Sequence, residues 1–217
     1  MVNPVPILQT IATETWIPAA WEDFLTFADD PTLVGGRFYY DQGEMRIEMA
    51  PVGSAQGHDN TIVSTLINLY AAMRSSPMQG FTNTTFRKSG LREFQPDLAF
   101  YIGEPGQTIT FSARSNAAVN LNEFDPPSLV IEIAASSLED DRTRKQALYQ
   151  RAGVREYWVV DVNASQVIAV EPGKAAQLRR SQVLPGLEID WVDSALKRAQ
   201  TEDDGAVSRW FLGLLTQ

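Results

Sequence analysis

The sequence predicts an α/β or α+β fold in which a mixed central sheet is flanked by helices. Residues 128–134 are dense in branched apolar side chains, which is typical of a central strand buried on both faces. A helical pattern then runs to Gly153, and a second apolar strand covers 156–161. Strand, helix and strand in this order build a parallel pair with a right-handed crossover. Apolar residues at helical spacing over 59–74 add a long helix with one apolar face.

The remaining elements follow from the same spacing and from turn signals. They are a helix at 18–28, a hairpin of 37–40 with 45–49, strands within 81–88 and 96–102, a hairpin of 166–170 with 177–184, and helices at 191–199 and 207–215. Ser136 and Glu139 have the spacing of a capping box at the start of the helix that follows residue 134. Residues 103–127 are polar and predict a long connection. No linker between domains is visible in the sequence, so we expect a single domain over 1–217.

The composition restricts the chemistry that the chain can perform. Its 217 residues carry a net charge of −9, with no cysteine and a single histidine, His58. Disulfides, thiolate zinc sites and cysteine nucleophiles are therefore excluded, and any metal would be held by oxygen ligands. The acidic balance disfavours nonspecific coating of nucleic acid, although a nuclease needs clustered carboxylates for its metal. No apolar run of membrane-spanning length and no secretory start occur, so we expect a cytoplasmic protein without membrane contact.

Two carboxylates stand out against their surroundings. Glu132 lies inside the apolar strand 128–134, where its desolvation would cost several kcal/mol unless a partner or a metal compensates it. Asp97 follows Pro96 at the start of another apolar strand, a place where an aspartate by itself is unremarkable. Together, Asp97 and Glu132 form a candidate pair that holds Mg²⁺ with the help of a main-chain carbonyl such as that of Ile133.

A lysine on the next helix completes the candidate site. Lys145 follows the Glu132 strand, and its ammonium group suits the stabilisation of charge that develops on a scissile phosphate. Tyr149 lies four residues further along and shares a helix face with Lys145. A lysine on a helix is more often only solvated, so the role of Lys145 depends on its position relative to the carboxylates.

Several segments together carry a resemblance to a known family. In chain order they are Gly43 to Pro51, His58 at the start of a helix, Pro96-Asp97, Leu129 to Ile133, the spaced set Asp141, Arg142, Lys145 and Tyr149, and Ala152 to Asp161. In these features the chain resembles the Uma-two (Uma2) family, a bacterial family of restriction-type endonucleases in the PD-(D/E)xK nuclease superfamily. The resemblance covers roughly residues 20–190, which leaves a helical tail at about 191–217.

The resemblance implies a restriction-endonuclease-like fold and a metal-dependent nuclease site. Asp97 matches the motif aspartate and Glu132 the motif glutamate, so these two residues would bind Mg²⁺ or Mn²⁺. The superfamily pattern has lysine two residues after the glutamate, where this chain has Ala134, so the lysine function would fall to Lys145 on the next helix. His58 also matches a family position, either as a helix-terminal residue bonded to a neighbour or as a group that touches the metal-bound water or a phosphate.

Other residues have more than one interpretation. Glu48 is either solvated or part of the acidic cluster, and Tyr157 and Trp158 are expected to pack in the core rather than stack on bases. A local basic rim is expected to contact a phosphate backbone. Its candidate members are Arg87, Lys88, Arg92, Arg142, Arg144, Arg151 and Arg155.

The predicted function is therefore that of a metal-dependent DNA endonuclease with Asp97, Glu132 and Lys145 as its catalytic residues. A homodimer is expected by analogy with restriction-type enzymes that cut both strands of a duplex. The alternative is a catalytically inactive nuclease-fold module that binds nucleic acid or protein. A third possibility is that Glu132 only forms a structural ion pair with an arginine such as Arg142.

Overall fold

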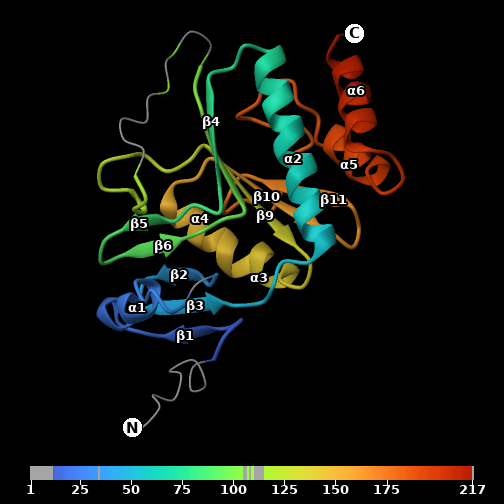
Figure 1. Cartoon of the computed structure of the whole chain (residues 1–217). Helices are drawn as coiled ribbons and strands as arrows, with labels where there is room; N and C mark the ends of the chain where they lie inside the picture. The colour runs from blue at the N-terminus through green and yellow to red at the C-terminus, as the bar shows by residue number, and fades with distance from the viewer. Residues whose placement is uncertain (1–11, 34, 105–106, 108, 110–114, 217) are drawn as a thin grey trace. The chain divides into compact units, whose positions relative to one another are not determined.

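The computed structural model describes residues 12–33, 35–104, 107, 109 and 115–216. The chain divides into two compact units, each built from segments that are distant in the sequence (Figure 1). The first unit comprises 1–51, 85–95 and 117–124, and the second comprises 52–84, 96–116 and 125–217. Compact units of this kind do not decide whether the chain folds as one domain, so the single domain over 1–217 stays a prediction.

The first unit is a six-stranded sheet with one short helix. Its strand order is β1-β3-β2-β6-β5-β8, antiparallel except for the parallel β5–β8 pair. The elements are β1 (Trp16–Pro18), α1 (Trp21–Ala28), β2 (Arg37–Asp41), β3 (Glu44–Glu48), β5 (Phe86–Lys88), β6 (Arg92–Phe94) and β8 (Val119–Asn120). Phe24 of α1 packs with Tyr40 and Ile47 in its apolar core. The predicted helix and the hairpin around residues 41–43 are confirmed.

The second unit is a five-stranded mixed sheet with helices. Its strand order is β11-β10-β9-β7-β4, in which only β9 and β10 are parallel. The strands are β4 (Met78–Thr82), β7 (Leu98–Ile102), β9 (Leu129–Ala134), β10 (Glu156–Asp161) and β11 (Gln166–Val170). The helices are α2 (Ser54–Met73), α3 (Leu138–Asp140), the π-helical turn η2 (Asp141–Lys145), α4 (Gln146–Ala152), α5 (Ile189–Arg198) and α6 (Asp204–Leu215). The predicted central strand, the parallel pair and the long helix are thus confirmed.

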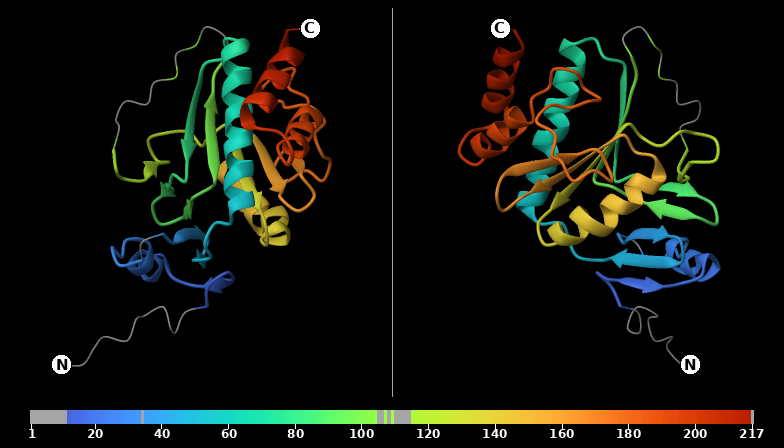
Figure 2. Two further views of the ribbon diagram at one scale, coloured as in Figure 1. Left: turned by 45° about the vertical axis from the view of Figure 1, so that its right-hand side comes forward. Right: turned by 180° about the vertical axis from the view of Figure 1, so that it is seen from behind.

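The two faces of strand β9 meet different helices. Ile131 and Ile133 point into the main core, which also contains buried residues of α2, α5 and α6. Since successive side chains of a strand alternate between faces, Glu132 lies on the opposite face. Tyr149 of α4 bonds to Glu132, and its ring centroid lies 4.8 Å from that of Tyr157 on β10. The segment from α3 to α4 therefore covers the face that carries Glu132 (Figure 2).

The helical segment after β9 is not the regular helix that its sequence suggests. Ser137, not Ser136, precedes α3, and its hydroxyl makes no capping bond but donates to Asp141 Oδ2 at 2.6 Å. The predicted capping box is therefore wrong. The turn from 141 to 145 is π-helical, a form that is often found at functional sites. The predicted stop is confirmed, since Gly153 has a φ of 89°, in the left-handed region that glycine adopts without strain.

Three other expectations need correction. The strand within 81–88 is two strands of different sheets, β4 and β5. Strand β11 forms its hairpin with β10, whereas 177–184 contributes two isolated bridges, from Gln177 to Val170 and from Arg180 to Glu188. The polar connection 103–127 lies partly outside the described residues, and its described part contains β8. None of the helices in the described ranges combines the length and the apolar character needed to cross a membrane.

A buried aspartate on α5 makes stability depend on pH. Asp193 Oδ1 accepts a hydrogen bond from Val167 N at 2.7 Å. Burial raises the pKa of Asp193 above its ordinary value of 3.8, although this hydrogen bond and Lys197 act in the opposite direction. The folded chain therefore binds the Asp193 proton more tightly than the unfolded chain, and this stabilisation is lost as pH rises through the raised pKa.

We expect Asp193→Asn to remove this titration. The free energy of unfolding of the variant minus that of the wild type should increase as pH rises from about 4 to about 7. Urea unfolding of both proteins across this range measures the difference. A difference that stays constant with pH would contradict the assignment.

Candidate active site

The two predicted carboxylates lie side by side on neighbouring strands. Strands β7 and β9 are antiparallel, and Leu98 pairs with Ile131. Continuing this register by one residue sets Asp97 opposite Glu132, and opposite residues of an antiparallel pair have side chains on the same face. Asp97 Oδ2 accepts a hydrogen bond from Ile133 N at 2.7 Å, which holds the carboxylate against β9. Asp97 is 4% exposed and Glu132 1% exposed.

Lys145 lies between Glu132 and a third carboxylate. Its Nζ is 3.7 Å from Glu132 Oε1 and 2.9 Å from Asp141 Oδ1, and the residue is 1% exposed. Tyr149 donates a hydrogen bond to the same Oε1 at 2.5 Å. Arg142, the arginine considered as the partner of Glu132, is exposed, and within the second unit the ionic partner is Lys145. The four-residue spacing of Tyr149 from Lys145 thus brings both side chains to Glu132.

Sequence reasoning included Asp141 in the family resemblance without giving it a role, and it missed Gln56. Asp141 is buried, and its four-residue spacing to Lys145 was a signal that could have identified it. Gln56, in the first turn of α2, donates from Nε2 to the carbonyl of Ile133 at 2.8 Å. No local pattern marks Gln56, because its partner lies 77 residues away. The Ile133 carbonyl, which we considered as a metal ligand, therefore already accepts a hydrogen bond.

The donor set fits a hard divalent cation. Asp97, Glu132 and Asp141 are carboxylates and Lys145 is the ammonium among them, so these four side chains have a formal charge of −2. Carboxylate oxygens are the ligands that Mg²⁺ prefers. In the part of the chain that the structure describes, no three His, Cys, Asp or Glu residues are grouped to hold a metal. A site here would therefore use Asp97 and Glu132 together with water.

A second buried carboxylate shows what a purely structural glutamate looks like in this fold. Glu156 accepts hydrogen bonds from Trp158 Nε1 at 2.6 Å and from the main-chain nitrogens of Gln182 and Val183 at 2.6 and 3.2 Å. These donors are neutral, and they join β10 to the segment before α5. Glu132, by contrast, lies in a group of ionisable side chains, an arrangement found both at functional sites and in structural ion-pair networks.

We expect Tyr149→Phe to destabilise the fold by about 1.5–3 kcal/mol, because it removes a hydrogen bond to a buried carboxylate. The ring and its contact with Tyr157 remain, so the loss isolates the hydroxyl group. Urea unfolding of the variant measures it. Tyr70→Phe is a matched control, since the Tyr70 hydroxyl bonds to a neutral carbonyl, that of Pro185, at 2.7 Å. Equal losses in the two variants would argue against a special role of the Glu132 contact.

The other candidate residues have described contacts of their own. His58 Nε2 lies 2.8 Å from Asp204 Oδ1, so His58 bonds to α6, in agreement with the bonded-neighbour interpretation. Glu48 belongs to the first unit, where Arg46 Nε donates to it at 2.8 Å. Tyr157 and Trp158 are fully buried, which confirms that they pack in the core.

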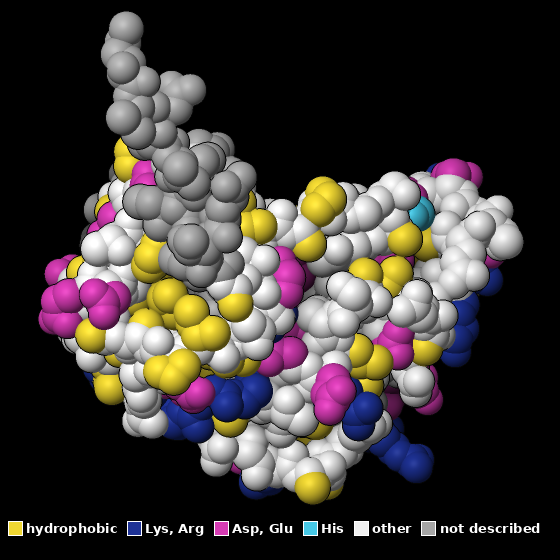
Figure 3. All heavy atoms as spheres, turned by 90° about the horizontal axis from the view of Figure 1, so that it is seen from below, with side chains coloured by type: hydrophobic (Ala, Val, Ile, Leu, Met, Phe, Trp, Pro, Cys, Tyr) yellow, Lys and Arg dark blue, Asp and Glu magenta, His cyan; other side chains and the backbone are white. Residues whose placement is uncertain are grey.

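The predicted basic rim is only partly available. Arg92 is buried and lies 3.2 Å from Asp41, so its assignment to the rim is wrong. Arg87 forms ion pairs with Asp29 and Glu93. On the face drawn in Figure 3, Lys and Arg side chains form several small groups among Asp and Glu.

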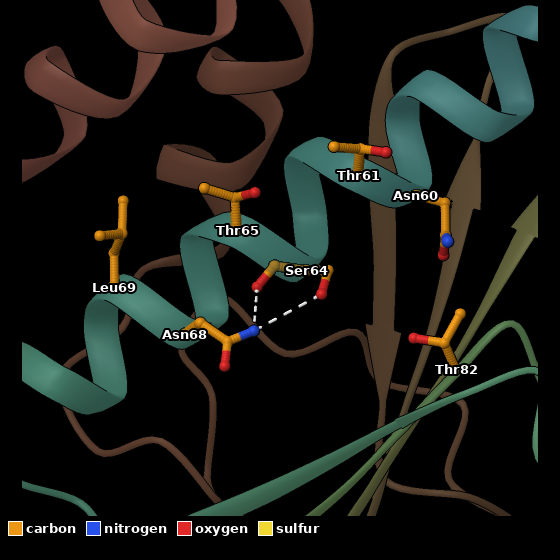
Figure 4. Close-up of a pocket in the computed structure, with 7 residues that line it drawn as sticks. All are labelled: Asn60, Thr61, Ser64, Thr65, Asn68, Leu69 and Thr82. Atoms are coloured by element: carbon orange, nitrogen blue, oxygen red, sulfur yellow. Dashed lines mark hydrogen bonds between the residues drawn. The ribbon is translucent and has the colours of Figure 1, made fainter.

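A surface pocket lies along α2. It has a volume of about 520 Å³. Its lining consists of Asn60, Thr61, Ser64, Thr65, Asn68 and Leu69 of α2 with Thr82 of β4 (Figure 4). None of these lining residues is titratable at neutral pH, so the pocket offers hydrogen bonds but no acid or base.

The mixed sheet with its helices has a nuclease-type fold. The structure is similar to the crystal structure of a "putative nuclease belonging to DUF820" from Anabaena variabilis ATCC 29413, with a TM-score of 0.54. The two sequences are 16% identical, and the similarity covers 82% of this chain and 99% of the other. At this identity the likeness shows the fold alone.

The sequence model of the Uma2 family, described as "Putative restriction endonuclease", matches residues 21–200. The chain belongs to this family, and the resemblance found in the sequence is confirmed. The comparison with curated proteins gave no match.

Proposed function

We propose that the chain is a divalent-metal-dependent endonuclease that hydrolyses phosphodiester bonds in DNA. The observation that carries the proposal is the position of Asp97 and Glu132 on neighbouring strands, with Lys145 Nζ 3.7 Å from Glu132 Oε1. The description of the family as restriction endonucleases supports the same reaction class. Asp97 and Glu132 would hold Mg²⁺ or Mn²⁺, and the ion would supply Lewis acidity and a nucleophilic water.

Each residue of the chain has a distinct part in this proposal. The Ile133 amide fixes one oxygen of Asp97, and the Tyr149 hydroxyl fixes Oε1 of Glu132, so both carboxylates are oriented before a ligand arrives. Lys145 contributes a positive charge beside Glu132, where it would stabilise the charge that develops on the phosphate. Ala134 cannot perform this task, so the proposal depends on the lysine of the helix.

One observation favours the alternative of an inactive nuclease-fold module. Asp97, Glu132 and Lys145 are each at most 4% exposed, and a phosphodiester can reach them only if neighbouring groups move. A module that only binds nucleic acid or protein needs no such opening. Cleavage therefore has to be measured directly.

The decisive experiment incubates the purified full chain with supercoiled and linear DNA in Mg²⁺, in Mn²⁺ and with a chelator. We expect nicked and linear products only when a metal is present. Single-stranded RNA of matched length tests the choice of substrate, and DNA should be the one that is cut. Binding of DNA without cleavage in either metal would support the inactive module.

A homodimer in the cytoplasm is the remaining part of the proposal. Two copies would supply the two cuts that a restriction-type enzyme makes in a duplex, and closed two-fold dimers are the commonest oligomers. Light scattering of the full chain, alone and with duplex DNA, tests the dimer. A monomer under both conditions would contradict it.

A further inference from the structure

We propose that Asp141 is a positioning residue that keeps the ammonium of Lys145 from occupying the metal-binding carboxylate Glu132. This inference rests on the metal site of the proposed function. It starts from two distances: Lys145 Nζ is 2.9 Å from Asp141 Oδ1 but 3.7 Å from Glu132 Oε1. Both are ion-pair distances, and the shorter one places the ammonium closer to Asp141 than to Glu132. Lys145 thus makes its short contact with Asp141.

Asp141 is held from two sides. The Ser137 hydroxyl donates to Asp141 Oδ2 at 2.6 Å, which leaves Oδ1 directed at Lys145. The Tyr157 hydroxyl donates to the main-chain oxygen of Asp141 at 3.0 Å and so anchors the π-helical turn to β10. The carboxylate is buried and cannot rotate away from Lys145 without breaking the bond to Ser137. Its position is therefore built into the fold.

The π-helical turn contains both ends of this contact, since η2 begins at Asp141 and ends at Lys145. Residues four apart lie on one helix face, so the turn directs the carboxylate and the ammonium to the same side, where Glu132 lies. Single π-helical turns inside α-helices are rare and are frequently found at functional sites.

Without the Asp141 charge, Lys145 Nζ still has the carboxylate of Glu132 at 3.7 Å. The lysine side chain is flexible, and its ammonium would move closer to Glu132 to compensate the buried charge. The tighter Lys145–Glu132 ion pair would then compete with a divalent cation for the same carboxylate. Asp141 therefore promotes metal binding even though it is not itself a metal ligand.

The test is the affinity for Mn²⁺ alone, measured by electron paramagnetic resonance of the free ion with the full chain and without DNA. We expect Asp141→Asn to weaken Mn²⁺ binding about tenfold. The same substitution in a Lys145→Met background should weaken it less than about threefold, because no ammonium is left to compete. Equal losses in the two backgrounds would mean that Asp141 acts only through its charge, and no loss would mean that it has no role; either result overturns the proposal.

Two further variants keep the test decisive if Lys145→Met does not fold. Ser137→Ala removes the bond that orients Asp141 and changes no charge, so it should weaken Mn²⁺ binding in the same direction by a smaller factor. Glu139→Gln removes one negative charge from an exposed residue of the same helix, and binding should not change. Unchanged binding in Ser137→Ala, or an equal loss in Glu139→Gln, would contradict a positioning role.

The proposed function and this inference can fail separately. Mn²⁺ binding that depends on Glu132, without DNA cleavage, would reject the nuclease. The comparison of Asp141→Asn in the wild-type and Lys145→Met backgrounds would still test the positioning role. The wild type could cleave DNA while the Asp141 and Lys145 substitutions have additive effects on Mn²⁺ affinity. This result would reject the positioning role of Asp141 but not the nuclease. Absence of any Mn²⁺ binding by the wild type would overturn both.

Discussion

Glu132→Gln is expected to lower the rate of DNA cleavage by at least about 10³-fold, since a metal-held transition state is worth several kcal/mol and each 1.36 kcal/mol is a factor of ten. The amide has the shape of the carboxylate but lacks its charge and one of its metal-binding oxygens. Asp97→Asn should have a loss of the same order for the same reason. Supercoiled plasmid in Mg²⁺ and in Mn²⁺ gives the rates.

The substitution is suited to the test because the fold should survive it. Lys145 keeps its 2.9 Å contact with Asp141, and Tyr149 can still donate to the amide oxygen at position 132. Circular dichroism and urea unfolding should therefore resemble those of the wild type. Glu139→Gln, which changes an exposed carboxylate, is the matched control and should cleave normally. More than a tenth of the wild-type rate in folded Glu132→Gln would reject the assignment.

Lys145→Met should cause the largest loss of stability among the substitutions considered. It leaves Glu132 and Asp141 buried without the ammonium between them, and removal of one partner from a buried ion pair costs about 3–5 kcal/mol. For a chain of this length the midpoint of thermal unfolding should fall by roughly 6–20 °C. Scanning calorimetry measures the shift, and cleavage should be lost as well.

Two comparisons identify the cause of that loss. Adding Asp141→Asn to Lys145→Met removes one of the two uncompensated carboxylates, so the double variant should be more stable than Lys145→Met alone. Lys88→Met changes an exposed lysine of β5 and should shift the midpoint little. A double variant that is less stable than Lys145→Met would mean that the buried charges are not the cause.

The outline of the fold follows from local sequence patterns. The apolar run at 129–134, the helical spacing of α2 and the stop at Gly153 each depend on residues close together in the chain, and all three are confirmed. Strand β6 escaped prediction because Arg92-Glu-Phe94 is short and largely polar, and its burial depends on pairing with β2 and β5. The predicted partner of β11, the segment 177–184, was wrong because local signals do not distinguish it from β10 as a neighbour.

The candidate site was predictable in its residue types but not in its contacts. Glu132 was conspicuous because a charge in an apolar strand has to be compensated, and Lys145 because it follows on the next helix. Gln56 and Ser137 carry no such signal, since their roles come from a bond to Ile133 and a bond to Asp141. A hydrogen bond between positions far apart in the chain produces no repeating residue pattern from which it could be predicted.

The sequence by itself determined the family, the parallel strand pair and the three side chains proposed for catalysis, because these depend on residue type and on spacing along one segment. Only the tertiary structure decided that Lys145 lies closer to Asp141 than to Glu132, and that Asp97 is fixed by the Ile133 amide. The physical reason is that strand register and the π-helical turn set distances of a few ångströms. Electrostatic energy changes steeply over such distances.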